Sequence, residues 1–141
     1  MLTWDFLFGV LKMVVNRKII QTSSAPEAIG MYSQGISTDQ FVFTSGQIPL
    51  IPGEGKLLDG SFSDQVKQVL ENVDAVLTAG GSSLQNAVKL TVFLTDLSNF
   101  PEVNAVFSQF FKSDPPARSA VEVSALPMKA EVEIEAVGVI P

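Results

Sequence analysis

The spacing of apolar residues along the chain separates short strands from two longer helices. Alternating or β-branched runs at 18–21, 35–37 and 41–44 predict strands, and residues 38–40 are short enough to join the last two as a hairpin. The segment 50–61 contains Pro and several Gly residues but no hydrophobic period, which indicates a loop. This part of the chain therefore predicts one edge of a sheet followed by an irregular connection.

Helical spacing of apolar residues occurs twice. In the range 62–77 the apolar positions recur every three or four residues, Ser61 and Asp64 form a capping pair at the start, and a glycine pair follows the end. A second amphipathic pattern covers 100–111 and has Pro101 in its first turn, where a missing N–H is tolerated. Both segments are predicted to be helices with one apolar face.

Three further strands are predicted at 87–94, 118–123 and 131–139. The first is almost continuously apolar, which is typical of a central strand covered on both faces. From the hairpin onward, the order of elements is two strands, helix, strand, helix, two strands. Helices between strands require crossover connections, so we predict an α/β (α+β) fold in which a mixed sheet carries two helices on one face. The other sheet face would stay uncovered in a monomer, and we therefore expect an oligomer.

Length and composition are consistent with a single globular domain. Hydrophobic residues make up 46% of the 141-residue chain and charged residues 17%, as in folded proteins rather than disordered ones. The apolar stretch near the N-terminus is too short and too interrupted by charge to span a bilayer. We expect residues 1–17 to be an N-terminal extension, residues 18–141 to form the domain, and no membrane to be bound.

The charge balance and two missing residue types restrict the chemistry. The net charge of −6 creates no basic field for phosphates, which disfavours nucleic acid as a partner. The chain has no Cys and no His, which excludes disulfides, thiolate nucleophiles, Ser-His triads and the commonest ligands of transition metals. We predict no metal site, and any catalysis has to use carboxylates, Lys, Arg, Tyr, hydroxyls, backbone groups and water.

Several polar residues are candidates for this chemistry, although each also has a structural explanation. Arg118 stands at the start of a predicted strand and would find ion-pair partners in Asp114 or Glu122. Three glutamates alternate with apolar residues and so share one strand face, normally the solvated one. The full set of candidates is Tyr32, Ser45, Gly46, Gln47, Asn104, Arg118, Glu131, Glu133 and Glu135.

Six segments, taken together and in order, resemble the RidA/YjgF family of enamine/imine deaminases. They are IGMYSQGI (29–36), TSGQIPL (44–50), the region 79–96, VNAVFSQFF (103–111), PPARSAVEV (115–123) and VEIEAVGV (132–139). The resemblance extends from about Lys18 to Ile140 and leaves out the N-terminal extension.

The resemblance implies a fold, an assembly and a reaction. The fold would be chorismate-mutase-like, and the assembly a homotrimer with three clefts between subunits. Members of the family hydrolyse 2-aminoacrylate-type enamines and their 2-imino acid tautomers, such as 2-iminopropanoate and 2-iminobutanoate, which pyridoxal-phosphate dehydratases release. The products are 2-keto acids and ammonia, and no cofactor takes part. Such an enzyme is expected in the cytoplasm, with an organelle left open.

The resemblance also implies roles for particular residues. Arg118 matches the arginine that holds the substrate carboxylate, a task that suits the two parallel donors of a guanidinium. Glu133 matches the glutamate proposed to position or activate the attacking water. Four other residues match positions that line the cleft and bind substrate, namely Tyr32, Ser45, Gly46 and Asn104.

Two positions depart from the usual pattern of the family. Ala120 stands where many relatives have cysteine, and Met31 where many have proline. The mechanism does not need the cysteine side chain, because the backbone carbonyl at position 120 serves as an acceptor for water. Ala120 is therefore retained among the substrate-binding positions.

Two other classes of function remain as alternatives. Some relatives have been described as endoribonucleases or translation inhibitors, a reading that the acidic charge and the missing histidine disfavour. The second alternative is a non-catalytic trimer that binds small carboxylates or keto acids. The presence of Glu133 near the carboxylate site disfavours it, because carboxylate binding alone does not call for a nearby anion.

Overall fold

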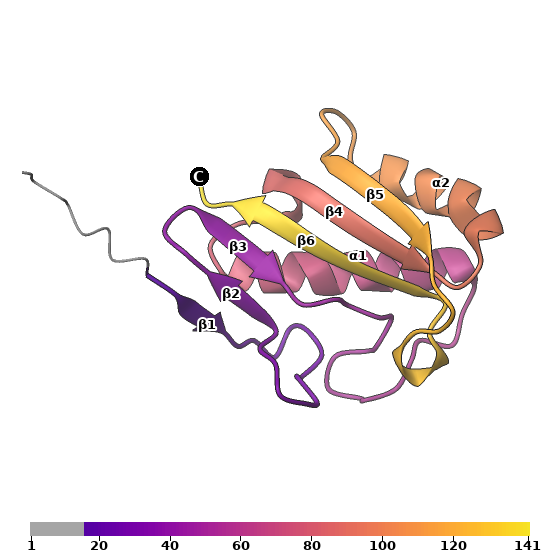
Figure 1. Cartoon of the computed structure of the whole chain (residues 1–141), viewed down its shortest axis with the longest axis horizontal. Coiled ribbons are helices and arrows are strands. Elements are labelled where there is room, and N and C mark those ends of the chain that lie inside the picture. The colour runs from indigo at the N-terminus through magenta and orange to yellow at the C-terminus, as the bar shows by residue number, and fades with distance from the viewer. Residues whose placement is uncertain (1–15) are drawn as a thin grey trace, which may run out of the picture.

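A computed structural model describes residues 16–141 of the chain. Of the predicted extension 1–17, residues 1–15 lie outside the described residues, so its separation from the domain stays a prediction. Figure 1 shows one mixed sheet with two helices packed against one of its faces. The strands are β1 (Lys18–Ile20), β2 (Gly35–Ser37), β3 (Phe41–Thr44), β4 (Ala87–Leu94), β5 (Ala117–Glu122) and β6 (Val132–Val139), and the helices are α1 (Phe62–Ala79) and α2 (Phe100–Phe110).

The six strands lie in the order β1-β2-β3-β6-β4-β5. All neighbouring pairs are antiparallel except β4 and β5, which are parallel because α2 forms the crossover between them. The predicted α+β class, the mixed sheet and the hairpin over 35–44 are confirmed, and the predicted strand ends agree with the structure to within one residue.

The start of α1 follows the prediction from sequence. The Ser61 side chain accepts the backbone N–H of Asp64 at 3.1 Å, and the Asp64 carboxylate accepts the backbone N–H of Ser61 at 3.3 Å. This reciprocal capping box satisfies two of the N–H groups that a helix start leaves without partners. At the other end, Gly80 lies so close to Ile20 and Val42 that an added Cβ would collide with both.

The two helices and one face of the sheet enclose the main hydrophobic core. Residues of α1, α2, β4 and β6 form one buried cluster, which includes Leu70, Leu77, Leu90 and Ile134. Side chains on the helix-facing side of β4 and β6 alternate regularly with less buried ones. Both helices therefore lie on the same face, as predicted.

The expectation that strand 87–94 is covered on both faces is wrong for the single chain. Leu90, Val92 and Leu94 are fully buried under the helices, but Thr91 and Phe93 on the other face are only partly buried. The reason is that both helices pack on one side of the sheet, so the residues of this strand that face the other side stay partly exposed.

The uncovered face carries apolar side chains. Ile19, Phe43 and Val121 project from it with exposed fractions of 64%, 44% and 42%. Such a patch is typical of a surface that another subunit covers, and the homotrimer stays a prediction. Within residues 16–141, no helix is long and apolar enough to cross a membrane.

Candidate functional site

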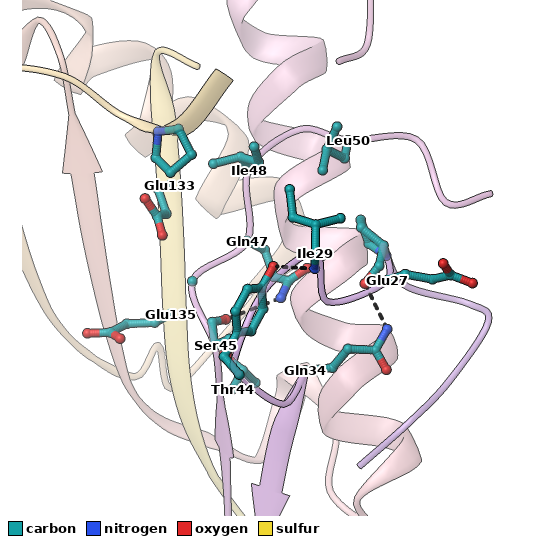
Figure 2. A pocket seen from close by; sticks show the side chains of 14 residues that line it. Glu27, Ile29, Gln34, Thr44, Ser45, Gln47, Ile48, Leu50, Glu133 and Glu135 are labelled. Carbon is teal, nitrogen blue, oxygen red and sulfur yellow. Dashed lines mark hydrogen bonds between the residues drawn. The ribbon is translucent and has the colours of Figure 1, made fainter. Parts of the chain in front are cut away.

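A cavity of about 520 Å³ lies where the segment after β3 passes β6. Figure 2 shows Glu133 and Glu135 on β6, and Gln47, Ile48 and Leu50 on the segment that follows β3. The polar lining includes Glu27, Tyr32, Ser45, Gln47, Glu133 and Glu135. The apolar lining includes Pro26, Ile29, Ile48, Leu50 and Pro127. Four predicted site residues, Tyr32, Ser45, Gly46 and Glu133, are thus brought together.

Glu133 and Gly46 are in close contact at the centre of this lining. An added Cβ at position 46 would overlap the Glu133 carboxylate, so only glycine lets the backbone approach it. Burial of the Glu133 carboxyl raises its pKa above the ordinary value, and the negative charge of Glu135 raises the pKa further. No Lys or Arg of the described residues lines the cavity, so neither carboxylate is neutralised there.

Tyr32 and Ser45 each use part of their hydrogen-bonding capacity on the backbone. The Tyr32 hydroxyl oxygen accepts the N–H of Ile29 at 3.3 Å, which leaves its proton for a ligand. The Ser45 hydroxyl donates to the carbonyl of Ser33 at 2.5 Å and keeps lone pairs that accept from a ligand. Both side chains are therefore positioned before any ligand binds.

Two buried glutamines fix the loops around the cavity, and of these Gln47 was a candidate from the sequence but Gln34 was not. Gln34 donates to the carbonyls of Thr22 and Pro26 at 2.9 and 2.7 Å, and its own oxygen accepts the N–H of Thr22 at 2.7 Å. Gln47 pairs through its backbone with Ile134 at 2.8 and 3.0 Å. Neither glutamine follows a hydrophobic period, and no signal of that kind marks them. Glu135, by contrast, shares a strand face with Glu133 and was visible in the alternation.

Arg118 lies elsewhere, between β5 and α2. Its guanidinium carbon is 4.9 Å from the ring centres of both Phe100 and Phe107, and one terminal nitrogen donates to the Asn104 side-chain oxygen at 2.7 Å. Partial burial lowers the pKa of Arg118, but a guanidinium stays charged at any physiological pH. The positions 100, 104 and 107 lie on one helix face, so both rings and the Asn104 amide meet the same guanidinium.

The ion-pair explanation of Arg118 is wrong. The one ion pair within residues 16–141 joins Lys56 and Glu54 at 3.3 Å. The Glu122 carboxylate instead accepts the backbone N–H of Leu97 at 2.9 Å. The guanidinium is therefore held by an amide and two aromatic rings, and its charge has no anionic partner in the described chain.

The single chain does not bring Arg118 and Glu133 together. Arg118 is paired with Leu90 and Ala120 with Val92, so both point to the helix-covered face of the sheet. Glu133 is paired with Phe93 and points to the opposite face, with β4 between β5 and β6. The predicted residues thus form two groups: Tyr32, Ser45, Gly46 and Glu133 around the cavity, and Asn104, Arg118 and Ala120 at β5 and α2.

The described residues contain no group of three or more carboxylates that could hold a metal ion. The cavity itself offers carboxylates, a phenol, a hydroxyl and backbone groups. These groups can orient water and transfer protons.

The sequence is similar to a known protein family and to proteins within it. The sequence profile of the family described as Endoribonuclease L-PSP matches residues 22–140. A RutC family protein of Pyrococcus horikoshii is 46% identical over 121 residues, which cover 86% of this chain and 96% of that protein. The human 2-iminobutanoate/2-iminopropanoate deaminase is 44% identical over 123 residues, which cover 87% of this chain and 90% of the deaminase.

Solved structures agree with the sequence comparison. The crystal structure of Escherichia coli TdcF with bound serine superposes with a TM-score of 0.82 at 46% identity, covering 86% of this chain and 98% of TdcF. The matched profile covers β2 to β6, both helices and every predicted site residue, and it leaves out β1.

Proposed function

The chain belongs to the RidA/YjgF family, described as Endoribonuclease L-PSP, and from this premise we propose that it hydrolyses reactive 2-enamine and 2-imino acids to 2-keto acids and ammonia. The substrates would be 2-aminoacrylate and its tautomer 2-iminopropanoate, together with 2-iminobutanoate. Pyridoxal-phosphate dehydratases release such compounds, and the protein would remove them. The observation that carries the proposal is the Glu133 carboxylate, held against Gly46 in a cavity without a cation.

The hydrolysis needs a positioned water and a group that transfers protons, and the cavity lining can supply both. Water adds to C2 of the imine and gives a carbinolamine, which then expels ammonia and leaves the 2-keto acid. A carboxylate such as Glu133 takes a proton from the attacking water and returns one to the departing nitrogen. Its raised pKa favours this exchange, because a base works best when its pKa approaches the working pH.

The substrate carboxylate is assigned to Arg118. A guanidinium that has rings on its faces and an amide at one edge keeps other N–H groups for two parallel bonds to a carboxylate. The serine bound to TdcF is also a small molecule with a carboxylate beside an amine-bearing carbon.

The separation of the two groups within one chain supports a homotrimer with sites between subunits. A substrate of a few heavy atoms cannot contact both faces of one sheet. A second copy that covers the apolar face with Phe43 and Val121 would bring its own Arg118 edge to the cavity of the first. We assign Tyr32, Ser45, Gly46 and Glu133 to one subunit of each site, and Asn104, Arg118 and Ala120 to its neighbour.

The name of the family profile favours endoribonuclease activity as a second candidate. In-line attack on a phosphodiester would need groups that neutralise phosphate, but the cavity is lined by Glu27, Glu133 and Glu135 and by no cation of the described chain. The third candidate, a carboxylate-binding protein without catalysis, accounts for Arg118 but gives Glu133 no task.

The assay that tests the proposal couples the protein to a threonine dehydratase. Added protein should accelerate the formation of 2-oxobutanoate and ammonia from the released 2-iminobutanoate, and RNA should stay intact in parallel incubations. An unchanged rate of keto-acid formation at saturating protein would overturn the deaminase assignment.

A further inference from the structure

Asn72 is a polar residue in the middle of the apolar face of α1. Among the described residues it is the one polar side chain with no exposed surface, at 0%. It lies between Val69 and Val76 on the helix, and both belong to the main core. A buried amide weakens a core unless its hydrogen bonds are made, so its partners explain its presence.

The hydrogen bonds of Asn72 leave the core and reach the wall of the cavity. Its side-chain nitrogen donates to the carbonyls of Ile48 and Leu50 at 3.2 and 2.9 Å, and its oxygen accepts from the Gln68 side chain at 2.9 Å. Both carbonyls can only accept, so the amide NH₂ group is the part of Asn72 that matters. The Gln68 bond fixes which end of the amide faces them.

The segment that Asn72 holds lies outside the main core, and its other backbone hydrogen bonds go to the neighbouring loop residues 56–58. Ile48 and Leu50 belong to a small separate hydrophobic cluster with Ala130. The N–H of Leu50 bonds to the carbonyl of Ile48 at 2.7 Å, a tight turn that sets the direction of both side chains. Ile48 and Leu50 line the cavity, on the segment that follows β3 in Figure 2.

The neighbouring residues are held by a different attachment. Gln47 is fixed to Ile134 on β6 by two backbone hydrogen bonds. Loss of the Asn72 amide would therefore release the turn at 48–50 while Gly46 and Gln47 stay beside Glu133. The apolar side chains of Ile48 and Leu50 would move, and the Glu133 carboxylate would not.

We infer that Asn72, oriented by Gln68, is a positioning residue that clamps the Ile48–Leu50 turn and so sets the apolar wall of the ligand cavity. This inference rests on the proposed function only where a keto acid is used as the ligand.

The test compares four forms of the full chain: wild type, Asn72→Leu, Gln68→Ala and Val69→Ala as the matched control. Asn72→Leu keeps the number and branching of the side-chain heavy atoms and removes the donor, and Val69→Ala removes apolar contacts of the same helix without touching the cavity. Amide hydrogen exchange is followed at Leu50 and Ile134, and binding of 2-oxobutanoate is titrated well below the melting temperature.

We expect Asn72→Leu to accelerate exchange at Leu50 by about tenfold relative to Ile134 and to weaken 2-oxobutanoate binding by about fivefold. Gln68→Ala should do the same to a smaller extent, and it carries the test alone if Asn72→Leu does not fold. The control should change both amides by the same factor. Equal exchange at Leu50 in wild type and Gln68→Ala, or the same selective loosening in Val69→Ala, would overturn the inference.

The exchange measurement also separates this inference from the proposed function. If wild type binds no keto acid and hydrolyses no imine, the deaminase proposal fails, but selective exchange at Leu50 still supports the clamp. If wild type hydrolyses imines and Asn72→Leu leaves the exchange rate of the Leu50 amide unchanged, only the inference about Asn72 fails.

Discussion

The cavity beside β6 and the Arg118 region beside α2 are built in opposite ways. The cavity is a partly open hollow, and it carries carboxylates that have no Lys or Arg of the described residues in the same lining. The Arg118 region is open at the edge of the sheet, and its cation rests on two aromatic rings and an amide. In the proposed reaction, the cavity transfers protons and the Arg118 region binds the substrate carboxylate.

This difference shows that neither region is a complete site for a 2-imino acid. Such a substrate has a carboxylate that needs a cation and an imine carbon that needs a positioned water. A partly buried charge without an opposite charge beside it reduces the stability of the fold. Proteins retain such charges mainly where a ligand or a partner subunit supplies the opposite charge. The two incomplete regions, on opposite faces of one sheet, are complementary to each other.

The largest effect is expected from Glu133→Gln. The amide keeps the size and the contact with Gly46 but cannot take a proton from water, so the rate of imine hydrolysis should fall by about 10²–10⁴-fold. The measurement is dehydratase-coupled keto-acid formation. Glu131→Gln is the control, because Glu131 is exposed just before β6 and does not line the cavity. Equal rates for the two variants would remove Glu133 from the chemistry.

The second largest effect should come from Arg118, which tests the open region. Arg118→Lys should lose activity nearly as severely as Arg118→Ala, about 10²-fold, because an ammonium keeps the charge but loses the planar fork. Stability should fall by only about 0.5–1 kcal/mol, through the lost ring contacts. Lys112→Ala, an exposed cation after α2, serves as control. A fully active lysine variant would show that geometry at Arg118 is unimportant.

Mixing the two inactive variants tests whether the regions come from different chains. If Glu133→Gln and Arg118→Ala chains assemble at random, about one cleft in four receives both intact groups, so activity should return to about a quarter of wild type. The mixture is made by unfolding and refolding the two chains together, and light scattering checks for three chain masses. Mixtures as inactive as their parents, with trimers present, would place each complete site within one subunit.

Local patterns predicted the fold well because its elements are defined by short-range chemistry. The Ser61 capping box, the tolerated Pro101 and the period of two on 132–139 each depend on residues close in sequence. The exception was strand 87–94. Its uncovered face carries Lys89, Thr91 and Phe93, which no helix covers, so the interpretation of the run as covered on both faces overstated its burial.

The site was predictable in its chemistry but not in its arrangement. The resemblance assigned roles to Arg118 and Glu133, which stay predictions, and the alternation of glutamates put Glu135 on the same strand face as Glu133, as the structure shows. Which sheet face each residue occupies depends on strand order and register, which are long-range properties. The roles of Gln34 and Asn72 were also hidden, because their bonds go to the backbone of distant loops.

The smallest predicted effect concerns Glu135, to which the resemblance assigns no role and which the structure places in the cavity lining. Burial first, and the charge of Glu135 second, raise the pKa of Glu133 above 4.5. Hydrolysis needs the carboxylate form, so activity should be lost as the pH falls through this raised pKa. Glu135→Gln removes the second cause and leaves the first. The acid limb of the kcat/KM profile should therefore move to lower pH and still lie above that of an ordinary carboxyl, with the neutral-pH rate little changed. Profiles of wild type, Glu135→Gln and the Glu131→Gln control decide this, and a limb that shifts equally in both variants would show that Glu133 responds to net charge rather than to its neighbour on β6.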